Sequence, residues 1–218
     1  MGVLNVKLFE KYRPREWSEL VGQPKAVAQL RKAGESGFGG QAYLLTGASG
    51  TGKTSAAYIV ARELADDMCI VEIDAQKCST EFVDRIENDM LIYGWGKGGR
   101  VWIVNEVHQL RAPVITRFLT LLEALPGHVA VIFTTTRVGE AKLFDDQIDA
   151  APLASRCIQV AFTTQGLTQA FAEDMRRKCI EAGTDGEPIE EYVKLFRKVK
   201  NNYREAWQAK QGGYVTTL

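Results

Sequence analysis

The 218-residue chain, with 45% hydrophobic and 25% charged residues, has the composition of a globular protein with one core, or with one core and a small satellite domain. Its 27 basic and 27 acidic side chains cancel, which excludes attraction to nucleic acid through a global field and leaves only a local basic surface. The four cysteines form no C-x-x-C pair, the first residues carry no apolar signal core, and no apolar run has membrane-spanning length, so we expect a cytoplasmic protein with reduced thiols, no zinc and no membrane partner.

The chain begins with an irregular arm over residues 8–23, in which Pro14 fixes an extended or turn conformation. The arm is rich in aromatic and apolar residues, so it must pack on something. It is either simply a packed arm, or Tyr12, Val21 and Gly22 wrap the base of a nucleotide that is held further along the chain.

A phosphate-binding loop follows a helix predicted over 24–32. The apolar run 42–45 predicts a buried strand, and apolar residues at helical spacing over 56–64 predict a helix. Between them stands the pattern G-x-x-x-x-G-K-[ST], whose main-chain N–H groups form an anion cradle with the positive end of the helix. Lys53 would reach the β- and γ-phosphates, and the Thr54 hydroxyl would ligate Mg²⁺. The residues expected to hold the nucleotide here are Gly47, Ala48, Ser49, Gly50, Thr51, Gly52, Lys53, Thr54 and Ser55.

The segment EKYRP at 10–14, followed by VGQ at 21–23 and the phosphate loop, resembles the start of a clamp-loader ATPase. That family comprises the replication factor C small subunits and the bacterial motor subunit, within the AAA+ class. The resemblance implies ATP and Mg²⁺ as cofactors. It also implies an α/β fold, an AAA+ P-loop NTPase with a parallel sheet over 1–162, a three-helix lid over 163–212 and a tail over 213–218. Strands alternating with helices predict the same parallel sheet, with its ligand at the strands' carboxyl ends.

A second strand is predicted over 69–74 and a helix over 80–92, and a glycine-rich loop comes next. In this loop, Lys97 and Arg100 would touch a nucleic-acid backbone and Trp95 would stack on a base. The alternative is a solvated connection in which Trp95 anchors the loop to the body.

A strand over 101–106 resembles the second nucleotide motif of the family, four apolar residues followed by Asp-Glu. Glu106 matches the residue that orients and activates the attacking water. Asn105 stands where Asp is usual; it can hydrogen-bond a water bound to Mg²⁺ but brings no negative charge, which leaves the rate of hydrolysis open. His108 is expected to be hydrogen-bonded structure, because no further metal ligands accompany it.

A helix predicted over 111–125 would expose Arg111 and Arg117. In clamp loaders this region faces the threaded DNA, but exposed arginines are usually solvated surface. A buried strand over 128–136 ends in hydroxyls, and the resemblance assigns to Thr136, with Thr135 as second choice, the residue that senses the γ-phosphate.

The Ser-Arg-Cys sequence at 155–157 resembles the clamp-loader motif whose arginine reaches the γ-phosphate bound by the neighbouring subunit. A guanidinium supplied in trans neutralises charge on the transferred phosphoryl group. The resemblance therefore implies that Arg156 acts in trans and that the partners include other AAA+ subunits.

Apolar stripes over 167–179 and 189–199 predict two helices, and a third begins near Tyr203. In the family the third lid helix opens with an arginine that contacts the nucleotide in cis, and Arg204 aligns with it. Clamp loaders usually continue into a helical collar, which this sequence does not contain.

The resemblance implies an ATPase subunit of a clamp-loader-like complex in DNA replication. ATP would let it grip a sliding clamp and primer–template DNA, and hydrolysis would release them. Two alternatives stay open. One is an AAA+ remodeller or nucleotide switch outside replication, favoured by the missing collar. The other is a non-catalytic nucleotide-binding module in which Asn105 has crippled hydrolysis.

Overall fold

The computed structural model describes residues 7–137, 151–184 and 186–211. A five-stranded parallel sheet with the strand order β2-β3-β4-β1-β5 forms its centre. The strands are β1 (Gln41–Thr46), β2 (Ile70–Asp74), β3 (Arg100–Asn105), β4 (Val129–Thr135) and β5 (Cys157–Ala161). Because all neighbours are parallel, the carboxyl ends of the strands meet at one edge, where Thr46 pairs with Thr135 and Asp74 with Asn105. The predicted α/β fold is confirmed.

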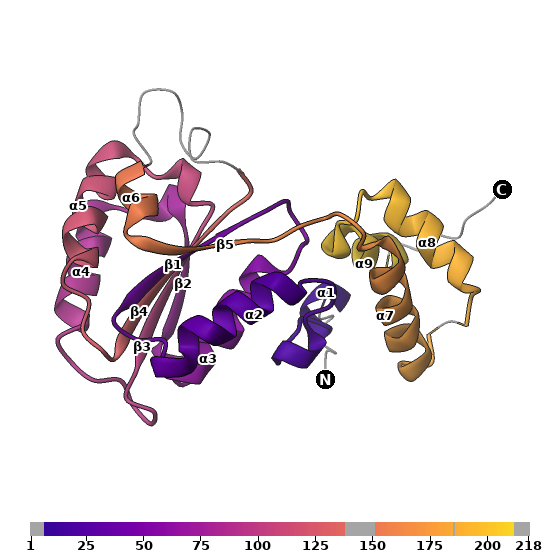
Figure 1. The fold of residues 1–218 in the computed structure, drawn as a ribbon, viewed down its shortest axis with the longest axis horizontal. Helices are drawn as coiled ribbons and strands as arrows, with labels where there is room; N and C mark the ends of the chain where they lie inside the picture. Colours follow the sequence, from indigo (N-terminus) through magenta and orange to yellow (C-terminus); the bar gives the residue numbers. More distant parts are fainter. Residues whose placement is uncertain (1–6, 138–150, 185, 212–218) are drawn as a thin grey trace, which may run out of the picture.

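Helices cover both faces of the sheet (Figure 1). Alternate residues of each strand point to opposite faces, so Leu44 joins one core with α4 and α5, while Leu45 joins the other with α2 and α3. The helices around the sheet are α2 (Pro24–Ala33), α3 (Lys53–Leu64), α4 (Thr80–Asp89), α5 (Ala112–Leu122) and α6 (Ala151–Ser155). Short 3-10 helices lie at Trp17–Glu19, Gly34–Ser36, Asp67–Cys69, Ala75–Lys77 and Val107–Gln109.

Three further helices form a separate group with its own core: α7 (Thr168–Glu181), α8 (Ile189–Lys198) and α9 (Tyr203–Gln211). The predicted apolar stripes supply that core. The arm also contributes to it, because α1 (Leu8–Lys11) lies beside α9 (Figure 1). Tyr12 stacks on Trp207 with ring centroids 4.5 Å apart. The division of the chain at residue 162 stays a prediction, and the predicted tail lies outside the described residues.

Helix α4 is shorter than predicted. It ends at Asp89 rather than at residue 92, because the chain must turn back to enter β3, and Gly94 N–H bonds the carbonyl of Gly98 at 2.8 Å within that turn. Its start is capped by Ser79, whose hydroxyl accepts the N–H of Phe82.

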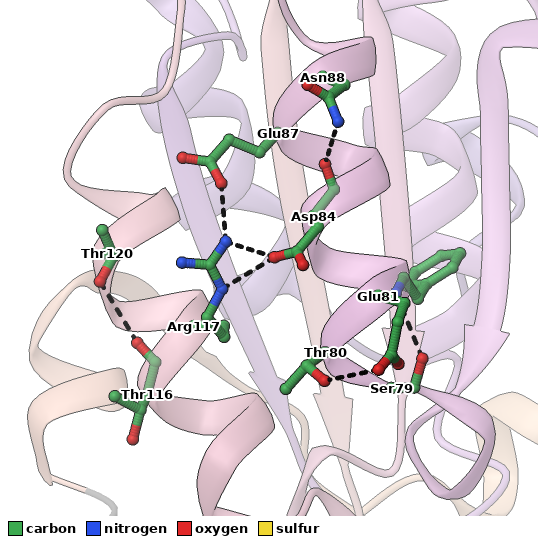
Figure 2. A network of polar contacts seen from close by, with 10 residues as sticks. Ser79, Thr80, Glu81, Asp84, Glu87, Asn88, Thr116, Arg117 and Thr120 are labelled. Carbon is green, nitrogen blue, oxygen red and sulfur yellow. Dashed lines mark hydrogen bonds and ion pairs between the residues drawn. The ribbon is translucent and has the colours of Figure 1, made fainter.

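Arg117 lies at the surface as predicted, with its side chain 40% exposed, but it is paired with acidic side chains. Its Nε donates to Asp84 at 2.9 Å and its Nη2 to Glu87 at 3.1 Å, and both carboxylates belong to α4 (Figure 2). The arginine therefore ties α5 to α4, and these two acidic partners weigh against a role in contacting DNA phosphates.

In the loop before β3, the structure contradicts the predicted anchoring by Trp95, whereas the predicted nucleic-acid contact of Trp95, Lys97 and Arg100 stays a prediction. The Lys97 ammonium donates to the carbonyl of Arg62 in α3, and Arg100 Nε donates to the carbonyl of Ile92 at 2.8 Å, so both side chains help to hold the loop in place. Trp95 does not anchor the loop, because it is 77% exposed.

Candidate functional site

The loop between β1 and α3 has the curled backbone that phosphate binding needs. Gly50 and Gly52 adopt left-handed conformations, with φ of 76° and 97°, which residues with a β-carbon rarely reach. Gly50 also has no room for a side chain, since a β-carbon there would lie 2.0 Å from Asn202 Oδ1. The Thr51 hydroxyl closes the curl by donating to the carbonyl of Ala48 at 2.9 Å.

Lys53, the first residue of α3, is buried at the base of this loop. Its ammonium donates to the carbonyls of Gly47 at 2.7 Å and Ala48 at 2.8 Å. Burial lowers the pKa of Lys53 to about 8, the charge of Glu106 opposes that shift, and the nearby charge of Arg204 adds to it. An anionic phosphate beside the ammonium would favour its charged form and raise this pKa again.

Glu106 stands immediately after β3 in a left-handed conformation, with φ of 55° and ψ of 49°. Such a backbone is uncommon for a residue with a side chain and is often found at functional sites. Its Oε2 accepts the Thr136 hydroxyl at 3.0 Å and lies 3.3 Å from His108 Nδ1, which in turn is 3.0 Å from the Thr135 hydroxyl. Thr136 therefore holds the Glu106 carboxylate directly, and Thr135 reaches it only through His108.

These parts line one cleft between the sheet and the α7–α9 group. The cleft holds about 880 Å³ of space between atoms, including the open solvent at its mouth. The predicted site residues that it brings together are Tyr12, Val21, Ser49, Gly50, Thr51, Gly52, Lys53, Thr54, Ser55, Glu106, Thr136 and Arg204. Nucleotide phosphates would meet the loop at the amino end of α3.

The comparisons with known proteins agree with this geometry. The model of the family described as "ATPase family associated with various cellular activities (AAA)" matches residues 43–163, which contain the loop, Glu106 and Thr136. The chain belongs to the AAA family of ATPases.

Its curated AAA relatives include replication proteins. DNA polymerase III subunit gamma/tau of Mycobacterium tuberculosis is 32% identical over 154 residues, which are 59% of this chain and 27% of the relative. The tau subunit of Escherichia coli is 29% identical over 175 residues, covering 70% and 26%. The replication factor C large subunit of Methanocella arvoryzae is 28% identical over 220 residues, covering 95% and 37%. The predicted resemblance to clamp-loader ATPases is confirmed, and the chain spans about a quarter to two fifths of the length of these relatives.

Among solved structures, the RuvB Holliday junction branch migration motor of Thermotoga maritima has a TM-score of 0.70 and 20% identity. The alignment covers 92% of this chain and 64% of that one. At this identity the likeness shows the AAA fold alone.

Four predicted nucleotide or metal residues do not line the AAA cleft. Gly47 and Ala48 form the start of the loop and bind Lys53 through their carbonyls. Gly22, with φ of 78°, is packed against α7, since a β-carbon there would lie 2.6 Å from Leu167 Cδ2. Asn105 lies between the two neighbouring strands, where its Nδ2 donates to Glu72 on β2 and its Oδ1 accepts the hydroxyl of Thr134 on β4 at 2.8 Å.

The donors in the cleft fit Mg²⁺, which prefers hard oxygen ligands. Thr54 and Glu106 line the same cleft, whereas the Asn105 side chain does not line it and donates to Glu72. Within residues 7–137, 151–184 and 186–211, no group of three or more His, Cys, Asp or Glu side chains could hold a metal by itself. A bound Mg²⁺ would therefore take several ligands from phosphate and water.

In the same part of the chain, no helix has the length and apolar character to cross a membrane.

The surroundings of Asn105 predict what Asn105→Asp will do. Glu72 accepts both the Asn105 amide and the Tyr58 hydroxyl, so an aspartate at 105 would face a carboxylate and lose a donor. Because residues 72 and 105 are partly exposed, we expect a loss of stability of about 0.5–1 kcal/mol, a Tm lower by roughly 1–4 °C and no gain in turnover. Thermal unfolding and single-turnover hydrolysis measure the two effects.

The matched control is Glu72→Gln, alone and combined with Asn105→Asp. A glutamine restores a donor to an aspartate at 105, so the double variant should recover the lost stability. A marked rise in turnover from Asn105→Asp alone would contradict this account of the site.

Arg156 lies outside the cleft of its own chain. Its Nε and Nη2 donate to Glu123 Oε1 at 3.2 and 2.5 Å, and its Nη1 donates to the carbonyl of Pro152 at 3.0 Å. This location suits an arginine that serves a neighbour, but the role in trans stays a prediction.

Several cleft residues were missed by the sequence reasoning. They are Phe9, Arg13, Pro14, Glu19, Leu20, Thr134, Phe171, Asp174, Lys178, Tyr203 and Trp207. A signal for two of them was present, because Asp174 and Lys178 fall at i+3 and i+7 from Phe171 and thus share the apolar face of α7. Charges on a core-facing stripe indicate a buried polar network.

Proposed function

We propose that this chain is an ATP-hydrolysing subunit of a clamp-loader-like complex, which uses ATP to bind a sliding clamp and primer–template DNA and hydrolysis to release them. The observation that carries the proposal is the single cleft lined by Lys53, Glu106, Thr136 and Arg204. The relatives in DNA polymerase III and replication factor C support the choice of replication.

In this proposal the loop amides hold the phosphates, and the Lys53 ammonium exchanges its two loop carbonyls for phosphate oxygens. Thr54 would help to hold Mg²⁺, which supplies charge neutralisation at the phosphates when bound. Glu106 accepts a hydrogen bond from the attacking water and orients it, while Thr136 fixes the Glu106 carboxylate through its hydroxyl. Arg204 reads the γ-phosphate from the same chain, and Arg156 from the neighbouring AAA subunit.

The direct test is the rate of ATP hydrolysis with and without a sliding clamp and primer–template DNA. The proposal predicts a slow basal rate and stimulation by both together. A rate that responds to neither would overturn the assignment to clamp loading while leaving the ATPase intact.

One surface is suited to a protein partner. Five large apolar side chains are exposed where the loop before β3 meets the start of β2: Met68, Leu91, Ile92, Tyr93 and Trp95. The two segments are in contact, since Trp95 N–H lies 3.3 Å from Cys69 Sγ and Lys97 N–H donates to Asp66 at 2.9 Å. Several large apolar side chains gathered in one exposed place mark an interaction surface. We call these five residues the apolar patch and propose that it binds the clamp.

Charge placed in the apolar patch should therefore uncouple the clamp. We expect Ile92→Asp to weaken clamp binding by about 30-fold, the size of an interface hot spot, while basal hydrolysis is unchanged. Titration of the clamp against the ATPase rate measures this. The matched control is Ile180→Asp, at an apolar residue that is 49% exposed on α7. Equal clamp affinity in both variants would remove the patch from the proposal.

A second candidate is a nucleotide switch with slow hydrolysis. One observation favours it, namely that the Asn105 side chain is held by Glu72 and Thr134 and does not itself line the cleft. It predicts tight ATP binding and a single-turnover rate that clamp and DNA do not change.

A further inference from the structure

A buried carboxylate lies in the wall of the cleft that α7 forms. Asp174 is 7% exposed, and its Oδ2 accepts hydrogen bonds from the Tyr203 hydroxyl and, at 2.7 Å, from the Lys178 ammonium. Its Oδ1 accepts Arg177 Nη2 at 2.5 Å. Burial alone would raise the pKa of Asp174, but the hydrogen bonds from Lys178 and Tyr203 hold it below its ordinary value. The carboxylate is therefore charged and fixed by three donors.

Tyr203 connects this carboxylate to the phosphate loop. It is the first residue of α9, and its N–H points to the carbonyl of Gly50 at 3.4 Å, while its hydroxyl reaches Asp174 at the other end of the side chain. Its ring packs edge-on against Phe171, with centroids 5.0 Å apart. One side chain thus joins α7, α9 and the loop.

The turn before α9 is seated on the same loop. Lys200 and Asn201 adopt left-handed conformations, with φ of 50° and 59°, and the Asn202 side chain occupies the space next to Gly50. Asn201 is tied down in turn, since it accepts the Thr168 hydroxyl at 2.9 Å. The start of α9 is therefore fixed from both sides, and Arg204 is the next residue after Tyr203.

Packing alone does not account for Asp174. A buried ion pair seldom stabilises a core more than apolar side chains of similar volume, because both charges lose their hydration. Asp174, Lys178 and Tyr203 all line the cleft that Arg204 lines. The charged network can orient the first turn of α9, because the hydroxyl of Tyr203, the first residue of α9, donates to Asp174 in α7.

We propose that Asp174 and Tyr203 are positioning residues that hold Arg204 beside the phosphate loop and so set how strongly the cleft prefers a nucleoside triphosphate to a diphosphate. The inference rests on the proposed function, in which Arg204 contacts the γ-phosphate. Without the Tyr203–Asp174 bond, the first turn of α9 keeps its apolar packing and its contacts with the phosphate loop, but it loses the hydrogen bond that orients it relative to α7.

The test is equilibrium binding of a slowly hydrolysed ATP analogue and of ADP to the intact chain and its variants. Tyr203→Phe removes one oxygen atom and leaves the ring. We expect it to weaken binding of the analogue about tenfold and binding of ADP less than about twofold, as the loss of one charge-assisted hydrogen bond predicts. Asp174→Asn should have the same effect on both affinities, and it provides the test if Tyr203→Phe does not fold.

The matched control is Arg177→Met, which removes a donor from the other oxygen of the same carboxylate but leaves Tyr203 untouched. It should keep the wild-type ratio of the two affinities. A Tyr203→Phe variant that weakens analogue and ADP equally, with a lower Tm, would show a purely structural role and overturn the inference.

Arg204→Ala distinguishes a failure of the positioning role of Asp174 and Tyr203 from a failure of the γ-phosphate contact proposed for Arg204. If it abolishes the preference for the triphosphate while Tyr203→Phe and Asp174→Asn keep that preference, only the positioning role is overturned. If Arg204→Ala itself keeps the preference, the reading of the γ-phosphate by Arg204 is wrong, and the positioning role is lost with it.

Discussion

Replacing Glu106 with glutamine is expected to lower the rate of ATP hydrolysis by about 10²–10⁴-fold, the usual contribution of a positioned general base. The amide has the shape of the carboxylate and still offers an oxygen to the Thr136 hydroxyl, so the local structure should persist. ATP affinity should stay within a few fold, because the loop and Lys53 supply the phosphate contacts. Single-turnover hydrolysis and equilibrium binding of a slowly hydrolysed analogue measure the two quantities separately.

The matched control is Glu19→Gln, because Glu19 is a second carboxylate that lines the cleft, and its Oε2 accepts the backbone N–H of Arg15. It should hydrolyse ATP at the wild-type rate. Wild-type turnover in Glu106→Gln would show that another group orients the water, and a joint loss of binding and turnover would show that the site itself had collapsed.

Arg156→Ala is expected to lower hydrolysis in the assembled complex by about 10³–10⁵-fold, the range known for an arginine supplied in trans. The basal rate of the isolated chain should not change, since Arg156 is bound to Glu123 and does not line its own cleft. Comparing the rates of the isolated and assembled protein measures the difference. Arg111→Ala, at an exposed arginine at the start of α5, is the matched control.

A mixing experiment makes the role in trans decisive. A chain with Lys53→Ala lacks a working cleft but can offer Arg156 to a neighbour, whereas a chain with Arg156→Ala has the opposite defect. The mixture should regain activity that neither variant shows alone. If mixing restores nothing, although the variants still assemble, Arg156 does not act across a subunit boundary.

The sequence predicted those parts of the fold whose signals are local. A buried strand, a glycine turn and an amphipathic helix stand next to one another around Lys53, so their geometry follows from neighbouring residues. The strand ends at Glu106 and Thr136 were also predictable, because parallel strands bring their carboxyl ends to one edge. The hydrogen bond between these two residues agrees with Thr136 as first choice over Thr135, although its role in sensing the γ-phosphate stays a prediction.

What the sequence did not predict depends on contacts across the chain. The acidic partners of Arg117 were not predicted, because Asp84 and Glu87, which accept its hydrogen bonds, lie about 30 residues earlier (Figure 2). The direction of Asn105 is set by Glu72 on the neighbouring strand, which no pattern around Asn105 reveals. The buried Asp174 likewise depends on Tyr203, which comes from another helix.

The contact between the arm and α9 has a consequence for the order of folding. The hydrogen bond from Leu8 N–H to Gln211 joins residues 203 positions apart, next to the stacked rings of Tyr12 and Trp207. Closing so long a loop in an unfolded chain carries a large entropic penalty, which shrinks once the sheet has already brought both segments near. We therefore expect the wall of the cleft that α9 provides to form after the sheet and the phosphate loop, so that a chain still emerging during synthesis would not yet enclose a nucleotide.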